Sequence, residues 1–140
     1  MSLTTRVIAR LDVKPSLGVV KGRRLDGLRC VADPATMMRA LDGGDATQDA
    51  DEIIWLDITA SLYGRPFEVA FFRSLNQGYL PVTVGGGIRS YRDFHAAIRW
   101  AAEKACINTA ALREPNLITE CAKSFGSQAV VVEIQTKRRN

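Results

Sequence analysis

The residues best suited to binding chemistry begin with three consecutive glycines, Gly85, Gly86 and Gly87. They follow a β-rich run at residues 81–84 and come directly before a helical pattern that begins at Ser90. Glycine has no Cβ atom, so backbone N–H groups at such a strand–glycine–helix turn can approach an anion closely. The turn therefore predicts a phosphate site. A βα turn that only needs conformational freedom is the alternative.

A second strand end of similar character follows one unit later, at residues 105–111. Here Asn108 and Thr109 come directly after the apolar pair Cys106 and Ile107. An amide and a hydroxyl at the entrance of a helix are both suitable donors to a phosphate. Two adjacent turns of this kind, at the same end of neighbouring strands, favour a phosphate site over two unrelated turns.

The elements that must position these residues alternate regularly along the chain. The predicted strands cover residues 5–13, 52–58, 80–84, 105–108 and 129–135, and the predicted helices cover residues 34–41, 66–77, 90–103 and 114–124. Residues 15–22 and 42–49 are expected to be loops, the second one flexible and acidic. Strict alternation predicts an α/β fold with parallel strands. The expected unit is a (βα)4-β half-barrel, a single domain over residues 1–140.

Composition argues against several classes of protein. The 140-residue chain has a net charge of +4, and its few aromatic residues do not alternate with its basic ones, which disfavours a nucleic-acid partner. Three cysteines without CxxC spacing and a single histidine indicate neither a disulfide framework nor a zinc site. No apolar run approaches the length of about 18 residues that a membrane span needs. We therefore expect no membrane contact, no metal, no cofactor and a location in the reducing cytoplasm.

Five separated segments resemble, in the same order, the cyclase subunit of imidazole glycerol phosphate synthase, a TIM barrel of histidine biosynthesis. The segments are residues 11–13, 55–61, 81–90, 105–111 and 125–132. The resemblance runs over residues 5–137 but covers only the N-terminal part of that family. Because a complete TIM barrel needs roughly 250 residues, it implies a partial (β/α)8 barrel that lacks the second half of the active site.

The resemblance implies roles for residues at the carboxyl ends of the predicted strands, where TIM barrels place catalysis. Asp12 matches the family's general acid/base in closing the imidazole ring, and a carboxylate that only caps a βα loop is the alternative. Gly87, Asn108 and Thr109 match the positions that hold one of the substrate's two phosphates. The expected ligand is therefore a phosphorylated small molecule.

Five further positions take candidate roles from the same resemblance. Lys21 belongs to a segment that matches a loop over the active site, and Asp57 either orients loops or ligand or is purely structural. At the opposite end of the strands, Arg6, Glu52 and Lys104 match a charged ring where ammonia enters from a glutaminase partner. Ordinary solvated charges at strand starts are the alternative for these three.

The chain also departs from the family pattern inside the barrel. A family aspartate is replaced by Gln135, which cannot serve as a proton-transfer carboxylate. Arg10 and Glu133 stand where the family has small residues, and by the period of two both point to the inside. Since an unpaired buried charge is costly, we expect that these two side chains meet each other or that this face is open to water.

These observations predict a truncated homologue of the cyclase, a lyase of histidine biosynthesis, that binds phosphate and is inactive alone. Two alternatives remain open: a non-catalytic half-barrel that self-associates, and a subunit that a second chain completes. Whether the chain is an enzyme therefore stays open as well. A paralogue of surface-polysaccharide synthesis is a further possibility, but the sequence Leu11-Asp12-Val13 favours the histidine branch.

The predicted sheet has consequences for assembly. In a barrel-ordered sheet the first and last predicted strands are free edges, and the concave face is expected to expose Ile8, Trp55 and Val131. Uncovered apolar edges and faces tend to find a partner. We therefore expect a homo-oligomer, most simply a two-fold dimer packed through that face and those edges.

Overall fold

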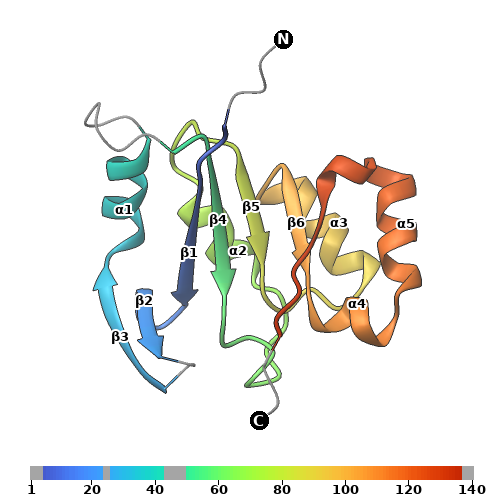
Figure 1. The fold of residues 1–140 in the computed structure, drawn as a ribbon, viewed down its shortest axis with the longest axis horizontal. Coiled ribbons are helices and arrows are strands. Elements are labelled where there is room, and N and C mark those ends of the chain that lie inside the picture. The colour runs from blue at the N-terminus through green and yellow to red at the C-terminus, as the bar shows by residue number, and fades with distance from the viewer. Residues whose placement is uncertain (1–4, 24–25, 43–49, 137–140) are drawn as a thin grey trace.

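A computed structural model, which describes residues 5–23, 26–42 and 50–136, places seven strands in one sheet in the order β3-β2-β1-β4-β5-β6-β7 (Figure 1). The strands are β1 (Ile8–Lys14), β2 (Gly18–Arg23), β3 (Asp26–Ala32), β4 (Glu52–Asp57), β5 (Val82–Gly85), β6 (Lys104–Ile107) and β7 (Val130–Val132). The helices are α1 (Pro34–Leu41), α2 (Val69–Leu75), α3 (Tyr91–Trp100), α4 (Thr109–Arg113) and α5 (Asn116–Phe125), with a 3₁₀ turn η1 (Ser127–Ala129) before β7.

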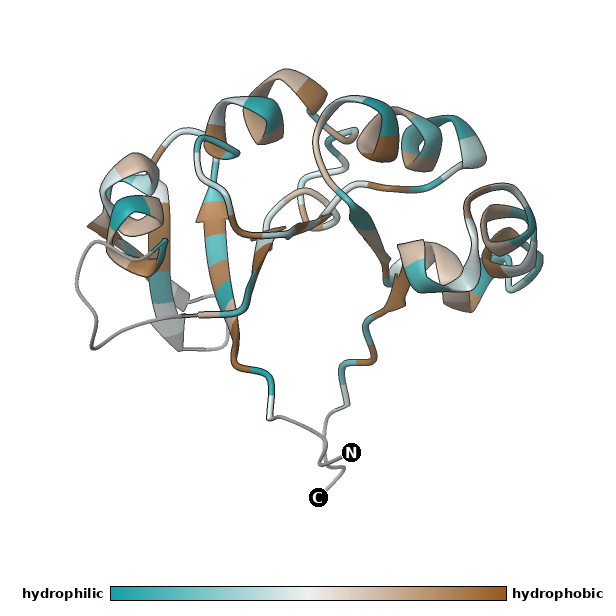
Figure 2. Ribbon diagram, turned by 90° about the horizontal axis from the view of Figure 1, so that it is seen from above, coloured by the Kyte–Doolittle hydropathy of each residue, from teal (hydrophilic) through white to brown (hydrophobic). Residues whose placement is uncertain are grey.

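The five strands β1, β4, β5, β6 and β7 are parallel to their neighbours, as the alternation of elements predicts. Seen from above, the helices follow the outside of an arc and the strands follow its inside (Figure 2). The concave side of the arc is not covered by any helix of the described chain. This arrangement is a partial (β/α)8 barrel, which confirms the predicted fold class.

The structure corrects the prediction of a strictly parallel sheet. Strands β2 and β3 pair antiparallel with each other, and β2 also pairs antiparallel with β1. Gly18 makes the entry possible because its φ of +95° is in the left-handed region and a Cβ there would lie 3.1 Å from the Ala32 carbonyl oxygen. As a result β1 is not a free edge, and the two edges of the sheet are β3 and β7.

The hydrophobic core lies between the outer face of the sheet and the helices. Trp55, Phe72 and Phe94 are its largest fully buried side chains. The expectation that Trp55 lies on the open concave face is wrong, because it is in register with Leu11 and Val84 and its side chain is fully buried. The period of two instead gives the concave side to its neighbours Ile54 and Leu56, in register with Arg10 and Asp12.

Side-chain caps mark the starts of two helices. Asp33 accepts hydrogen bonds from the backbone N–H groups of Ala35 and Thr36 at the start of α1, and Ser90 and Asp93 form a capping box on α3. The short helix α4 was not predicted, and residues 43–49 of the loop predicted at 42–49 lie outside the described residues. In the part of the chain that the structure describes, every helix is too short or too polar to cross a membrane.

Candidate functional site

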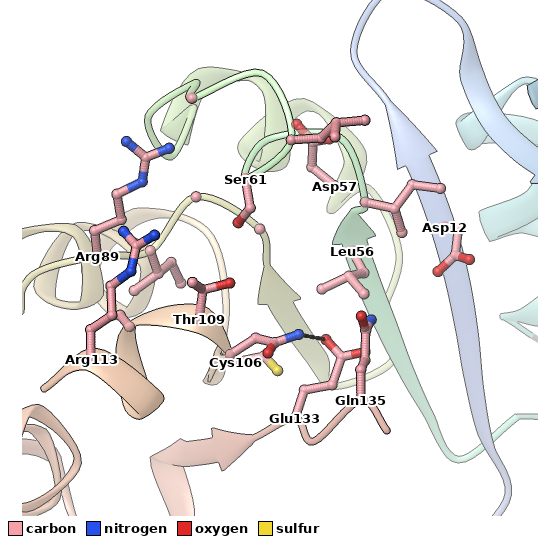
Figure 3. A pocket seen from close by; sticks show the side chains of 18 of the residues that line it. Asp12, Leu56, Asp57, Ser61, Arg89, Cys106, Thr109, Arg113, Glu133 and Gln135 are labelled. Carbon is pink, nitrogen blue, oxygen red and sulfur yellow. Dashed lines mark hydrogen bonds between the residues drawn. The ribbon is translucent and has the colours of Figure 1, made fainter. Parts of the chain in front are cut away.

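One open pocket of about 950 Å³ lies at the carboxyl ends of β1, β4, β5 and β6 (Figure 3). In a parallel α/β sheet this is the edge at which ligands bind, because the turns that follow successive strands converge there. The pocket brings together four of the residues that the sequence singled out as ligand or acid/base candidates: Asp12, Gly87, Asn108 and Thr109.

The glycine turn after β5 is packed too tightly for any side chain. Gly86 and Gly87 have φ values of +103° and +81°. A Cβ atom would lie 2.4 Å from the Asp57 carbonyl oxygen at Gly86 and 2.8 Å from the Phe67 nitrogen at Gly87. Close packing therefore accounts for both glycines by itself. Both also line the pocket, so the turn remains compatible with a bound anion.

Asn108 and Thr109 stand between β6 and α4. The hydroxyl-bearing side chain of Thr109 points into the pocket (Figure 3). The Asn108 side-chain nitrogen donates to Oε2 of Glu133 at 3.4 Å. The amide that was assigned to phosphate is thus also linked to a carboxylate that follows β7.

Asp12 belongs to a small charged network on the concave face. Its Oδ1 accepts from Nε of Arg10 at 3.1 Å, and the same guanidinium group donates to Oε1 of Glu133 at 2.8 Å. Gln135 donates to that Glu133 oxygen as well, at 3.0 Å. The prediction that Arg10 and Glu133 meet is confirmed, and the pair forms within one chain.

The two members of this pair differ in their exposure to water. The Glu133 side chain keeps 14% of its surface exposed and that of Arg10 46%, so the pair is only partly buried. Burial opposes the charge of Arg10, but the hydrogen bonds and charges of Asp12 and Glu133 together raise the pKa of its guanidinium group. Arg10 is therefore a permanent cation beside the candidate acid/base residue.

Asp57 lines the pocket, but its carboxylate is occupied by contacts within its own loop. The residue is only 5% exposed, and its carboxylate accepts hydrogen bonds from the backbone N–H groups of Thr59 and Ala60 at 2.9 and 3.1 Å. Its second oxygen lies 2.9 Å from the guanidinium group of Arg65. These contacts fix the loop that carries Ser61 at the rim of the pocket.

The opposite end of the strands carries a separate charged cluster. Glu52 is buried and accepts from Nζ of Lys104 at 2.6 Å and from the guanidinium group of Arg6. The hydrogen bond from Lys104, more than that from Arg6, holds the pKa of Glu52 below its usual range. The structure thus brings together the three residues matched to the ammonia-entry ring. Because Glu52 is buried and paired, it is not an ordinary solvated charge at a strand start.

Comparison with known proteins decides the family. The family model described as "Histidine biosynthesis protein" matches residues 6–140. The chain belongs to this family. Relatives named imidazole glycerol phosphate synthase subunit HisF are 45% identical over 135 residues in Legionella pneumophila, 44% over 137 in Methanocaldococcus jannaschii and 45% over 139 in Methanopyrus kandleri. The resemblance stated from the sequence motifs is thereby confirmed.

The match covers almost all of this chain but only part of each relative. It spans 95%, 97% and 99% of the chain, and 61%, 48% and 49% of the three HisF proteins, respectively. The chain therefore spans about half the length of the relatives that it matches. The half-barrel seen in the structure agrees with this, since β1, β4, β5, β6 and β7 form an open arc.

Lys21 is not brought into the pocket. It lies on β2 with an exposed side chain, and its neighbour Gly22 is the β2 residue that lines the cavity. The expected loop over the site is instead part of a hairpin, in which alternate side chains face opposite sides. Among the described residues Lys21 forms no side-chain hydrogen bond or ion pair that would support a substrate role.

Several lining residues were not singled out from the sequence, among them the polar residues Ser61, Arg89 and Arg113. Arg89 comes two residues after Gly87, so its place beside the glycine turn could be seen in the sequence, whereas Arg113 ends a helix that was not predicted. Cys106 also lines the pocket, but burial raises the pKa of its thiol to about 11. This thiol stays protonated near neutral pH and is a poor nucleophile.

Within residues 5–23, 26–42 and 50–136, no group of three or more His, Cys, Asp or Glu side chains could hold a metal ion. One end of the pocket carries the carboxylate of Asp12 with its guanidinium partner, Arg10. The other end carries an amide, a hydroxyl and two guanidinium groups, from Asn108, Thr109, Arg89 and Arg113. These groups suit the binding and orientation of an anion.

Proposed function

We propose that this chain is a HisF-like half-barrel that binds phosphorylated small molecules at the strand ends of β5 and β6. The observation that carries the proposal is the convergence of Gly87, Asn108 and Thr109 in one pocket with Asp12. Membership of the histidine biosynthesis family supports it, because the relatives are named as subunits of a synthase of imidazole glycerol phosphate. The ligand class is therefore a phosphate ester.

We further propose that the chain alone does not catalyse cyclisation. Asp12, the candidate general acid/base, is paired with Arg10. At the inward position where the family has a further aspartate, this chain carries the amide of Gln135. The amide of Gln135 cannot take or give a proton as a carboxylate does. Loss of one acid/base group typically removes about 10² to 10⁴ in rate.

Two partners fit the two ends of the half-barrel. The cluster of Glu52 with Arg6 and Lys104 supports a glutaminase subunit as partner at the amino-terminal end of the strands. The uncovered edge of β7 and the concave face support a second copy of the chain, since Val132 and Ile134 are 41% and 78% exposed. Completion by a different half-barrel chain is the alternative for that face.

The free thiols of Cys30, Cys106 and Cys121 support a reducing, cytoplasmic location.

The proposal is tested by calorimetric titration of the purified chain with inorganic phosphate, together with a cyclase assay in the presence of ammonia. We expect millimolar phosphate binding that Thr109→Val weakens, and no turnover. Phosphate binding that Thr109→Val leaves unchanged would remove the proposed site. Turnover at the rate of a full-length relative would contradict the second part.

A further inference from the structure

The end of the pocket that holds Thr109 carries two guanidinium groups, those of Arg89 and Arg113. Arg89 and Arg113 both line the cavity, and in Figure 3 their guanidinium groups point the same way, on the side of Ser61 and Thr109. In the described part of the chain neither group forms an ion pair with a carboxylate. Both residues are exposed to solvent.

The carboxylates of the pocket are largely neutralised elsewhere. Arg10 pairs with Asp12 and Glu133, and Asp57 pairs with a guanidinium group from its own loop. Glu114 is the exception, since it lines the rim and forms no ion pair among the described residues. The charges are therefore segregated, with the unpaired positive charge concentrated around Thr109.

The helix that follows the glycine turn does not supply this positive charge. At the start of α3, Oδ2 of Asp93 accepts from the backbone N–H groups of Arg89 and Ser90, at 3.0 and 3.1 Å. The carboxylate of the capping box thus occupies donors that an anion would otherwise use, and it adds a negative charge there. A dianion in this pocket needs charged side chains as well.

Arg89 and Arg113 are positioned to supply that charge from two sides. Nη2 of Arg89 donates to the carbonyl oxygen of Arg65 at 2.9 Å, and Arg65 is itself held by Asp57 and by Glu68. Arg113 lies four residues after Thr109 on α4, so that the two side chains share one face of the helix.

We propose that Arg89 and Arg113 form a guanidinium clamp that grips the phosphate seated at Thr109, and that the clamp makes the site selective for doubly charged phosphate monoesters. This inference rests on the proposed function, because it concerns the same pocket. Guanidinium groups bind phosphate oxygens through paired, charge-assisted hydrogen bonds, and two such cations attract a dianion more strongly than a singly charged anion.

The test is titration with inorganic phosphate, and with nitrate as a singly charged probe, at pH 7.5 and low salt. We expect Arg113→Ala to raise the Kd for phosphate about tenfold, as the loss of one charge-assisted contact predicts. Arg113→Lys should recover only part of this, because lysine lacks the planar fork. Glu114→Gln should strengthen binding, since it removes the neighbouring negative charge.

Arg92→Ala is the matched control, because it removes the same charge from an exposed position on α3 outside the pocket lining. Arg113 makes no side-chain hydrogen bond among the described residues, so its variant tests the clamp without disturbing the fold. Phosphate binding that Arg113→Ala and Arg89→Ala weaken no more than Arg92→Ala would overturn the clamp and leave the proposed site standing. Wild-type protein without phosphate binding would overturn both. Equal affinity for nitrate and phosphate would contradict the selectivity.

Discussion

A guanidinium nitrogen of Arg10 lies 2.8 Å from Oε1 of Glu133, although 123 residues separate the two along the chain. Arg10 belongs to β1 and Glu133 follows β7, so the pair joins the first and the last of the five parallel strands. The same network reaches Asp12 on one side and Asn108 on the other. The contact therefore ties together the two ends of the arc and the candidate site between them.

Removal of the ion pair between Arg10 and Glu133 should lower the free energy of unfolding modestly. The pair is partly open to water, so we expect a coupling free energy of about 1 kcal/mol, well below the 3–5 kcal/mol of a fully buried pair. A double-mutant cycle with Arg10→Met and Glu133→Gln, followed by urea unfolding, measures it. A coupling of zero would show that the pair does not hold the ends of the arc together.

Glu52 should make the stability of the fold depend on acid. Its folded-state pKa is depressed, chiefly by Lys104, so its contribution is present above its unfolded pKa of about 4.3 and is lost as the pH falls through the folded value. Glu52→Gln should cost about 1–3 kcal/mol at pH 7, and the difference from wild type should shrink below pH 4. Urea unfolding from pH 7 to pH 3 measures this.

Glu120→Gln, at an exposed position on α5, is the control for the acid experiment. It should shift the free energy of unfolding by less than about 0.5 kcal/mol at any pH. A difference between wild type and Glu52→Gln that stays constant with pH would contradict the role of Glu52.

The glycine turn should reject a side chain at Gly86 far more strongly than at another left-handed glycine. Gly86→Ala forces a Cβ to within 2.4 Å of a backbone oxygen, whereas a Cβ at Gly64 meets no atom within 4 Å. We expect Gly64→Ala to cost about 1 kcal/mol for its φ alone, and Gly86→Ala to cost more than about 3 kcal/mol. Thermal unfolding of both variants tests this. Equal costs would mean that the turn is less tightly packed than described.

The uncovered edge predicts self-association. We expect light scattering to give a multiple of 15.4 kDa, and Ile134→Lys to lower it by placing a charge beside the β7 edge. Tyr79→Lys is the control, because Tyr79 is 98% exposed and precedes the central strand β5. A wild-type mass of 15.4 kDa at micromolar concentration would end this prediction.

The sequence allowed the parallel strands and the residues at their ends to be predicted, because both depend on local chemistry. Apolar runs that end in Asp12, in the glycine turn or in Asn108 specify strand ends without knowledge of distant contacts. The meeting of Arg10 and Glu133 followed from parity along each strand and from the cost of an unpaired charge.

The features that were missed depend on pairing between segments. The β2–β3 hairpin mixes polar and apolar residues, so its pattern resembled a loop until the pairing with β1 was known. The face on which Trp55 lies depends on the register between β1 and β4, which a period within one strand cannot give. Arg113 joins the pocket only because the short helix α4 turns it back toward Thr109.

The central claim, a phosphate-binding half-barrel, is tested most directly by amide NMR during titration with inorganic phosphate. The account predicts that the resonances of Gly87, Asn108 and Thr109 shift first and saturate together at millimolar phosphate, while those of Lys21 on β2 and Glu120 on α5 stay unchanged. Uniform small shifts over the whole chain, or no shift of these three residues at tens of millimolar phosphate, would contradict it.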